Sequence, residues 1–179
     1  MQLEAELGQS GQKLVLLPVV VAHLLSYQQR KPRSFEAGGQ LFGRQQGQAI
    51  LVEVATGPRP SDRRSRYSYR PDRRLEQVEI DEKFASGFRF LGDWHSHPEP
   101  VPKPSTTDIS SMQDCFRRSR HELHAFVLLI IGASELPLAL HGSLHSSHEM
   151  LDLRFQIKTS VGLATSLSDN GSHAKESED

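Results

Sequence analysis

The chain has 179 residues, 36% of them hydrophobic, a net charge of −1 at pH 7 and a single cysteine. This length and apolar content predict one compact domain with its own core, and the balanced charge excludes a general attraction to nucleic acid or to a membrane surface. One cysteine excludes an internal disulfide and fits a reducing compartment. Because no apolar run is long enough to span a bilayer, we expect a cytoplasmic protein.

The first predicted elements follow one another between residues 14 and 29. Leu14–Leu17 is a short apolar run typical of a strand, and Pro18 suits the first turn of a helix, where its missing N–H leaves no bond unmade. The apolar spacing after Pro18 predicts that this helix continues to about Gln29.

A glycine-containing segment, Glu36–Gly43, leads into a strand predicted for Ala49–Ala55. We reject a phosphate-binding loop because no Gly-Lys-Ser/Thr sequence follows the glycines. Two interpretations of Gly38 and Gly39 remain open. They allow the backbone to approach a functional site closely, or they relax an ordinary hairpin.

Arginines dominate residues 57–74, where seven of them stand against two aspartates, with two tyrosines in between. Basic residues mixed with aromatic ones can follow a nucleic-acid strand through phosphate contacts and base stacking. A solvated rim, or a surface for an acidic protein, explains the same pattern. Because the whole chain is not basic, we favour the solvated rim over nucleic-acid binding. Within this rim Arg63, Arg64 and Arg66 are the candidate substrate-binding residues.

Residues 72–86 are predicted to form a helix capped by the aspartate at its start, and Phe88–His97 the next strand. Side chains alternate along a strand, so His95 and His97 share one face. Asp93 lies on the same face and is a candidate to orient a metal-binding histidine without itself binding the metal. A plain exposed carboxylate is the alternative.

The prolines after His97 return the chain to the two histidines. Pro98 ends the strand, and the prolines that follow impose an extended, stiff crossing. Ser105 and Asp108 then open a helix. Two imidazoles and one carboxylate leave the fourth position of a tetrahedral zinc ion free for water, as in catalytic zinc sites. We therefore predict that His95, His97 and Asp108 bind zinc.

Each half of this pattern has a simpler explanation. A His-Ser-His run is common in strands, and Ser105–Asp108 is also a capping box that satisfies free helix N–H groups. The two halves joined by prolines are far more specific than either one alone.

Apolar runs after the motif predict a buried strand at 125–131 and further strands at 136–144 and 151–157. After these strands the sequence turns to serine, glycine and acidic residues. We therefore predict one domain over residues 1–160 and a disordered polar tail over residues 161–179.

These residues resemble the signature of the JAMM, or MPN-plus, zinc metallopeptidases of the JAB-domain family. The signature reads His-x-His-Pro, six residues, then Ser-x-x-Asp, and it is matched without a gap by His95, His97, Pro98, Ser105 and Asp108. The glutamate that this family carries upstream, at the start of a glycine-containing strand, has its counterpart in Glu36.

The resemblance implies an α/β fold, an MPN/JAB-like and cytidine-deaminase-like sandwich whose mixed, mostly antiparallel sheet is flanked by helices. It implies one Zn²⁺ per chain and cleavage of a peptide or isopeptide bond after the C-terminal tail of ubiquitin or a ubiquitin-like protein. In such a reaction Glu36 moves the proton from water to the departing amine, and Ser105 donates a hydrogen bond to the oxyanion.

Residues 58–74 and 92–108 are also similar to the stand-alone JAMM peptidases of bacterial CBASS antiphage operons. That similarity implies a substrate, a cyclic-oligonucleotide synthase conjugated through its C-terminus, and an activating- and conjugating-enzyme-like system in the same pathway. Related peptidases act on ubiquitin-like modifiers. A non-catalytic MPN scaffold and a nucleic-acid-binding module built on the arginines are further alternatives, but we expect neither a membrane nor a nucleic-acid partner.

Overall fold

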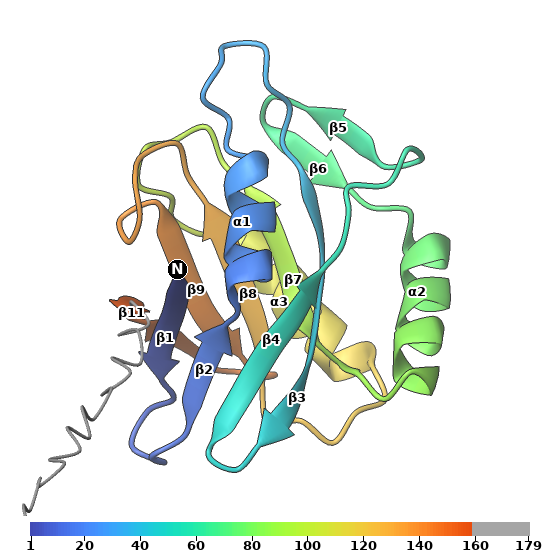
Figure 1. Cartoon of the computed structure of the whole chain (residues 1–179). Coiled ribbons are helices and arrows are strands. Elements are labelled where there is room, and N and C mark those ends of the chain that lie inside the picture. The colour runs from blue at the N-terminus through green and yellow to red at the C-terminus, as the bar shows by residue number, and fades with distance from the viewer. Residues whose placement is uncertain (159–179) are drawn as a thin grey trace, which may run out of the picture.

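The computed structural model describes residues 1–158, so the tail predicted for 161–179 lies outside the described residues (Figure 1). The helices are α1 (Pro18–Ser26), α2 (Arg73–Ala85) and α3 (Thr106–Arg118). The strands are β1 (Gln2–Glu6), β2 (Lys13–Leu16), β3 (Gly38–Gln46), β4 (Ala49–Ala55), β5 (Arg63–Ser65), β6 (Ser68–Arg70), β7 (Arg89–Ser96), β8 (Phe126–Ile131), β9 (Leu140–His145), β10 (Met150–Leu153) and β11 (Gln156–Lys158). Within residues 1–158, no helix is long and apolar enough to cross a membrane.

Nine of these strands form one sheet in the order β10-β9-β8-β7-β3-β4-β2-β1-β11. The β2–β4 and β7–β8 pairs are parallel and the other neighbours are antiparallel, as predicted for a mixed, mostly antiparallel sheet. The outermost strands, β10 and β11, are joined by Arg154 and Phe155 alone. Because two residues span so little, the sheet must curl until its edges approach each other.

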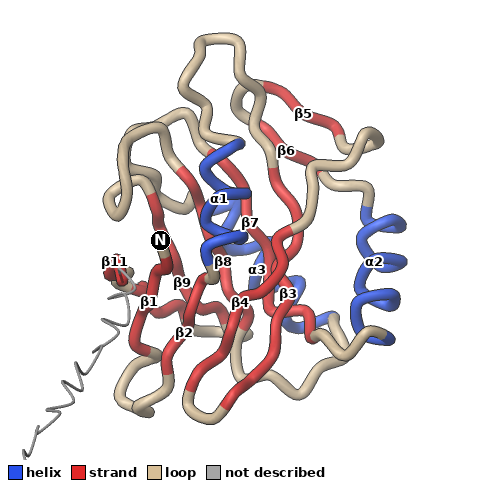
Figure 2. The backbone as a smooth tube through the Cα atoms, in the orientation of Figure 1, coloured by secondary structure: helices blue, strands red, loops and turns tan. Residues whose placement is uncertain are grey.

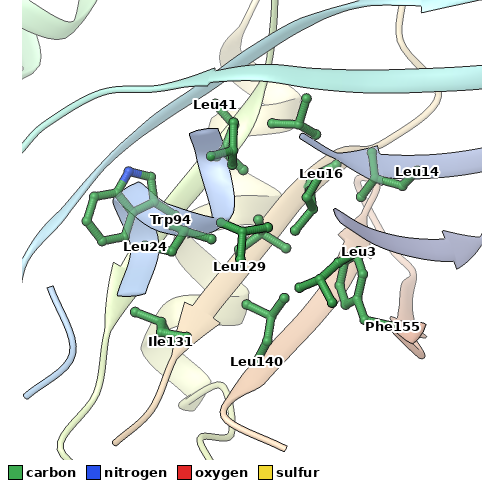
Figure 3. Close-up of a cluster of buried hydrophobic side chains, with 14 of the residues drawn as sticks. Leu3, Leu14, Leu16, Leu24, Leu41, Trp94, Leu129, Ile131, Leu140 and Phe155 are labelled. Carbon is green, nitrogen blue, oxygen red and sulfur yellow. The ribbon is translucent and has the colours of Figure 1, made fainter. Parts of the chain in front are cut away.

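The curled sheet separates two cores, with α1 in front of it and α3 behind it (Figure 2). On β8 the side chains alternate, so Leu129 and Ile131 join the larger core with α1 and Trp94 (Figure 3). Leu128 and its neighbours on the opposite face pack against α3. A strand buried on both faces explains why this run is apolar throughout.

Capping residues determine where α2 and α3 begin, and the start of α3 carries Asp108. The Asp72 side chain accepts hydrogen bonds from the first turn of α2, as predicted. At α3 the capping box is complete, because Ser105 Oγ accepts from the Asp108 N–H at 3.1 Å and Asp108 Oδ2 accepts from the Ser105 N–H at 2.7 Å. The capping interpretation of Ser105–Asp108 is therefore confirmed, and it fixes where Asp108 lies.

Gly92 brings β7 against β8 just before the candidate site. Its φ of 148° lies in a region that side chains rarely adopt, and a Cβ there would meet the carbonyl oxygen of Val127 at 1.9 Å. The pairing of β3 with β7 also shifts register beside it, between Leu41 and Phe42. This irregularity sets the face on which Asp93, His95 and His97 emerge.

Cys115 packs at the margin of the core between the sheet and α3. Burial, and next the Asp93 carboxylate, raise the pKa of its thiol to about 11. Since only the thiolate reacts, alkylation by iodoacetamide at pH 8 is expected to be about 100-fold slower than for a free cysteine, and to rise about tenfold per pH unit up to pH 10. Mass spectrometry of the native and the urea-unfolded chain measures this ratio, and equal rates would contradict it.

Candidate active site

Strand β7 and the start of α3 bring together the three predicted metal donors. β7 lies between β3 and β8, and the backbone N–H of His97 donates to the carbonyl of Ile131 at 2.9 Å, so the pairing with β8 continues past the end of the strand. The capping box then holds Asp108 over the two imidazoles. Both halves of the motif thus meet, as their spacing predicted.

The three side chains bring their donor atoms to separations near those around a tetrahedral ion, with a different Asp108 oxygen facing each imidazole. His95 Nε2 lies 3.0 Å from His97 Nε2 and 3.4 Å from Asp108 Oδ1, and His97 Nε2 lies 3.7 Å from Asp108 Oδ2. Zinc with bonds of about 2.0–2.1 Å at tetrahedral angles places neighbouring donor atoms roughly 3.3 Å apart. The donor set therefore fits a tetrahedral ion that keeps its fourth position open.

Glu99 orients His97 and was not found by the sequence analysis. Its Oε2 lies 3.2 Å from His97 Nδ1, and a proton on Nδ1 leaves the Nε2 lone pair for a metal. Burial, and next the charge of His95, lower the pKa of His97, which favours its neutral, ligating form. The signal in the sequence was the His97-x-Glu99 spacing, although Pro98 made the pairing hard to infer.

Asp108 is held in its ionised form. Burial alone raises the pKa of its carboxyl, but hydrogen bonds from His95 and Ser105 hold that pKa well below its ordinary value. The Ser105 hydroxyl donates to Asp108 Oδ2 at 2.7 Å. In this arrangement Ser105 positions the carboxylate, and it must rotate its O–H to serve the oxyanion role predicted for it.

Glu36 lies two residues before β3 and is fixed through its backbone. Its N–H donates to the carbonyl of Ser65 at 2.7 Å, and Arg64 Nε donates to its carbonyl oxygen at 2.6 Å. The next residue, Ala37, exchanges hydrogen bonds with Ser96 of β7. The glutamate is only 6% exposed, and burial, followed by the charges of Asp108 and Glu99, raises its pKa to about 7.

One cleft of about 660 Å³ connects the predicted residues. Its lining includes Glu36, Asp93, His95, His97, Ser105 and Asp108. The sheet forms its floor, while α3 stands on one side and the β5–β6 hairpin with the start of α2 stands on the other. A carboxylate that can move protons, a metal-binding face and a hydroxyl donor therefore open into the same space.

The arginines predicted to bind substrate lie outside the lining of this cleft. Arg64 donates to the backbone of Glu36, and Arg66 donates to the carbonyls of Lys31 and Pro32. Arg63 is exposed on the hairpin. Two of the three arginines thus brace the loop that carries Glu36, because backbone carbonyls in a loop need donors that the sheet does not supply.

Close neighbours explain why residues 38 and 39 are both glycine. A Cβ on Gly38 would meet the Tyr69 ring at 2.4 Å, and a Cβ on Gly39 would meet the Thr56 carbonyl oxygen at 1.9 Å. Both glycines therefore allow protein segments to pack closely beside the site.

Asp93 shares the face of the histidines, as predicted, but the described residues give it no hydrogen bond to either ring. Its Oδ1 is buried and has no hydrogen-bond partner within residues 1–158. Burial, and next the Glu76 carboxylate, raise the pKa of Asp93 to about 7. The prediction that it orients a metal ligand therefore has no contact to support it.

Comparison with known proteins places this site in a family. Residues 18–141 match the family described as prokaryotic homologs of the JAB domain. A protein of Vibrio cholerae serotype O1 named CD-NTase/cGAS isopeptidase is 36% identical over 127 residues, which cover 68% of this chain and 78% of that protein. A probable metalloprotease of Sinorhizobium fredii is 29% identical over 141 residues, 74% of this chain and 85% of that protein.

The fold has a solved counterpart as well. The solution structure of a protein from Desulfitobacterium hafniense matches with a TM-score of 0.56 and 23% identity, covering 76% of this chain and 87% of that one. The family match includes Glu36 and all three metal donors, so the predicted JAMM resemblance and fold class are confirmed. The chain belongs to the prokaryotic branch of the JAB-domain family.

Proposed function

We propose that this chain is a zinc-dependent isopeptidase that releases a conjugated cyclic-oligonucleotide synthase by cleaving the bond after its C-terminal tail, as part of CBASS antiphage defence. The observation that carries the proposal is the metal-binding face of His95, His97 and Asp108, which opens into the same cleft as Glu36. A water-activating metal beside a buried carboxylate is the arrangement that amide hydrolysis requires.

Zinc is the ion that the donor set fits best. Two imidazole nitrogens and one carboxylate group at these separations suit tetrahedral zinc, whereas magnesium and calcium prefer oxygen ligands. A bound zinc ion supplies a Lewis acid that acidifies water and polarises a carbonyl. We propose one ion per chain.

The residues of the chain divide the remaining work. The Glu36 carboxylate accepts the proton of the attacking water and returns it to the departing amine, and burial raises its pKa above its ordinary value, which favours the return of the proton. Ser105 holds Asp108 in place and, after rotation of its O–H, donates to the oxyanion. Glu99 holds the His97 ring in the ligating tautomer.

The substrate is proposed from the Vibrio cholerae relative, whose name describes an isopeptidase of CD-NTase and cGAS. A synthase of this class, joined through its C-terminus to a target by an activating- and conjugating-enzyme-like system, is the proposed partner. A ubiquitin-like modifier carries the same kind of C-terminal tail and is the alternative substrate.

Two other functions receive less support from the contacts. A scaffold without catalysis has no use for a tetrahedral donor set with Glu36 in the same cleft. A nucleic-acid module needs free arginines, whereas Arg64 and Arg66 donate to backbone carbonyls.

Metal removal tests the proposal. The purified chain is expected to contain one zinc ion and to cleave a synthase conjugate, with cleavage abolished by 1,10-phenanthroline and restored by added zinc. Elemental analysis and mass spectrometry of the released tail measure both. Undiminished cleavage by the metal-free chain would mean that the donor set is not the catalytic centre.

Replacing Arg64 by alanine is expected to lower kcat about tenfold with little change in KM, because the Glu36 backbone loses the donor that fixes it. Arg63→Ala is the matched control, since Arg63 is an exposed neighbour on the same strand. Guanidinium ion is expected to restore part of the rate in Arg64→Ala alone. Equal losses in both variants, or a loss confined to KM, would show that Arg64 does not act through Glu36.

A further inference from the structure

The cleft continues past the metal donors to a carboxylate that the mechanism does not use. Asp93 precedes His95 by two residues on β7 and lines the same cleft, together with Ser111 and Met112 of α3 and with Glu76 of α2. Two residues of strand place the Asp93 and His95 positions roughly 7 Å apart. That distance corresponds to about two residues of an extended peptide.

Within the described residues Asp93 makes no ion pair and its Oδ1 has no hydrogen-bond partner, although Arg59 and Arg73 lie nearby. Arg73 Nη1 bonds Glu76 Oε2 at 2.8 Å. Arg59 pairs with Glu79 and, through Nη1 at 3.8 Å, with Glu76, and it donates to Gln40 Oε1 at 3.0 Å. Within residues 1–158 no ion pair reaches Asp93, and its Oδ1 is a buried acceptor without a donor. A buried acceptor without a donor destabilises the folded chain. A donor supplied by a bound molecule accounts for its presence.

The register of β3 against β7 indicates which part of a substrate lies over Asp93. Gly38 pairs with His95 and Gln40 pairs with Asp93, so Glu36, two residues before Gly38, lies at the His97 end. Asp93 lies at the opposite end. Under the proposed function Glu36 delivers a proton to the departing amine, so the amine occupies the His97 end and the acyl tail extends over Asp93.

We propose that Asp93 forms a specificity subsite that accepts a hydrogen bond from an N–H donor of the acyl tail, one or two residues before the cleaved bond. This proposal rests on the proposed function for its direction. The donor is either a backbone amide of the tail or a lysine or arginine side chain. Both present N–H to a carboxylate that lacks one, and this contact fixes the tail in register with the metal-binding face.

The probe is a series of ten-residue peptides joined through their C-terminal carboxyl to the ε-amine of a lysine in a fluorescent reporter peptide. One arm carries N-methylation at each of the last three tail amides in turn. The second arm replaces lysine or arginine at these positions by norleucine. A third arm alters only residues on the lysine side of the bond and serves as the reference.

The zinc-loaded full chain is compared with Asp93→Leu, which removes the acceptor, and Asp93→Asn, which keeps one oxygen acceptor. Asp81→Asn on the exposed face of α2 is the matched control. One tail modification is expected to lower kcat/KM about tenfold in the wild-type chain and less than twofold in Asp93→Leu, a coupling typical of residues in contact. In Asp93→Asn the same modification is expected to lower kcat/KM by an intermediate factor, and in Asp81→Asn by the same tenfold as in the wild-type chain.

A binding measurement distinguishes failure of the Asp93 subsite from failure of the proposed isopeptidase function. The same uncleaved peptides are titrated against zinc-loaded Glu36→Gln by fluorescence anisotropy, with and without Asp93→Leu. Coupling in binding without cleavage by any variant would retain the Asp93 subsite and contradict the isopeptidase function. Cleavage with additive effects at every tail position, or coupling only to the lysine side, would overturn the subsite.

Discussion

Replacing Glu36 by glutamine is expected to lower kcat for conjugate cleavage by about 10²–10⁴-fold while the chain keeps its zinc. Glutamine has nearly the same shape but cannot accept and return a proton. The contacts that hold residue 36 use its backbone N–H and carbonyl, so the substitution leaves them in place. The loss is therefore chemical rather than structural.

The pH profile adds a second readout for this variant. Burial raises the pKa of Glu36 to about 7, and only its ionised form accepts the proton, so the rate of the wild-type chain rises with pH along an acid limb and then levels off. A cation bound nearby lowers that pKa, which places the limb at or below pH 7. The residual rate of Glu36→Gln is expected to lack this limb.

Glu82→Gln on the exposed side of α2 is the control for a glutamate outside the cleft. Zinc content by elemental analysis and kcat by single-turnover cleavage complete the test. Cleavage within a few-fold of the wild-type rate, with zinc bound, would remove Glu36 from the mechanism.

The sequence was sufficient to predict the elements that carry the donors. Prolines, capping residues and strand alternation are local signals, and they predicted β7, the start of α3 and the common face of His95 and His97. The run predicted as one strand over 151–157 instead forms β10 and β11, because Arg154 and Phe155 carry the chain between opposite edges of the sheet. That closure depends on long-range pairing, which no local pattern encodes.

The residues that hold the catalytic side chains in place could not be predicted from the sequence, for the same reason. Arg64 and Glu36 are 28 residues apart, and their contact depends on how the β5–β6 hairpin folds over the cleft. An arginine-rich run gave a charge pattern but no indication of which guanidinium groups would be used internally. Within residues 1–158 the Asp93 Oδ1 also lacks a donor, which depends on the tertiary structure because Arg59 and Arg73 bind other carboxylates.

Replacing Asp108 by alanine is expected to weaken zinc binding by more than about 100-fold and to abolish cleavage, since one of three protein donors is lost. The variant also loses the capping-box carboxylate, which costs about 1 kcal/mol of stability. Competition with a chromophoric chelator measures the affinity. Asp114→Ala, which removes an exposed carboxylate from the same helix, is the control, and an unchanged zinc affinity in Asp108→Ala would exclude Asp108 as a ligand.

Ser105→Ala separates the two roles that the hydroxyl can have. If Ser105 only positions Asp108, the variant binds zinc about 10–100-fold more weakly but regains its kcat at saturating zinc. If the hydroxyl also rotates to meet the oxyanion, kcat stays about 10²–10³-fold lower even when zinc is saturating. We expect the second result. A metal ion bound to Asp108 offsets the negative charge that the Ser105 hydroxyl otherwise stabilises, and Ser105 lines the same cleft as the metal donors.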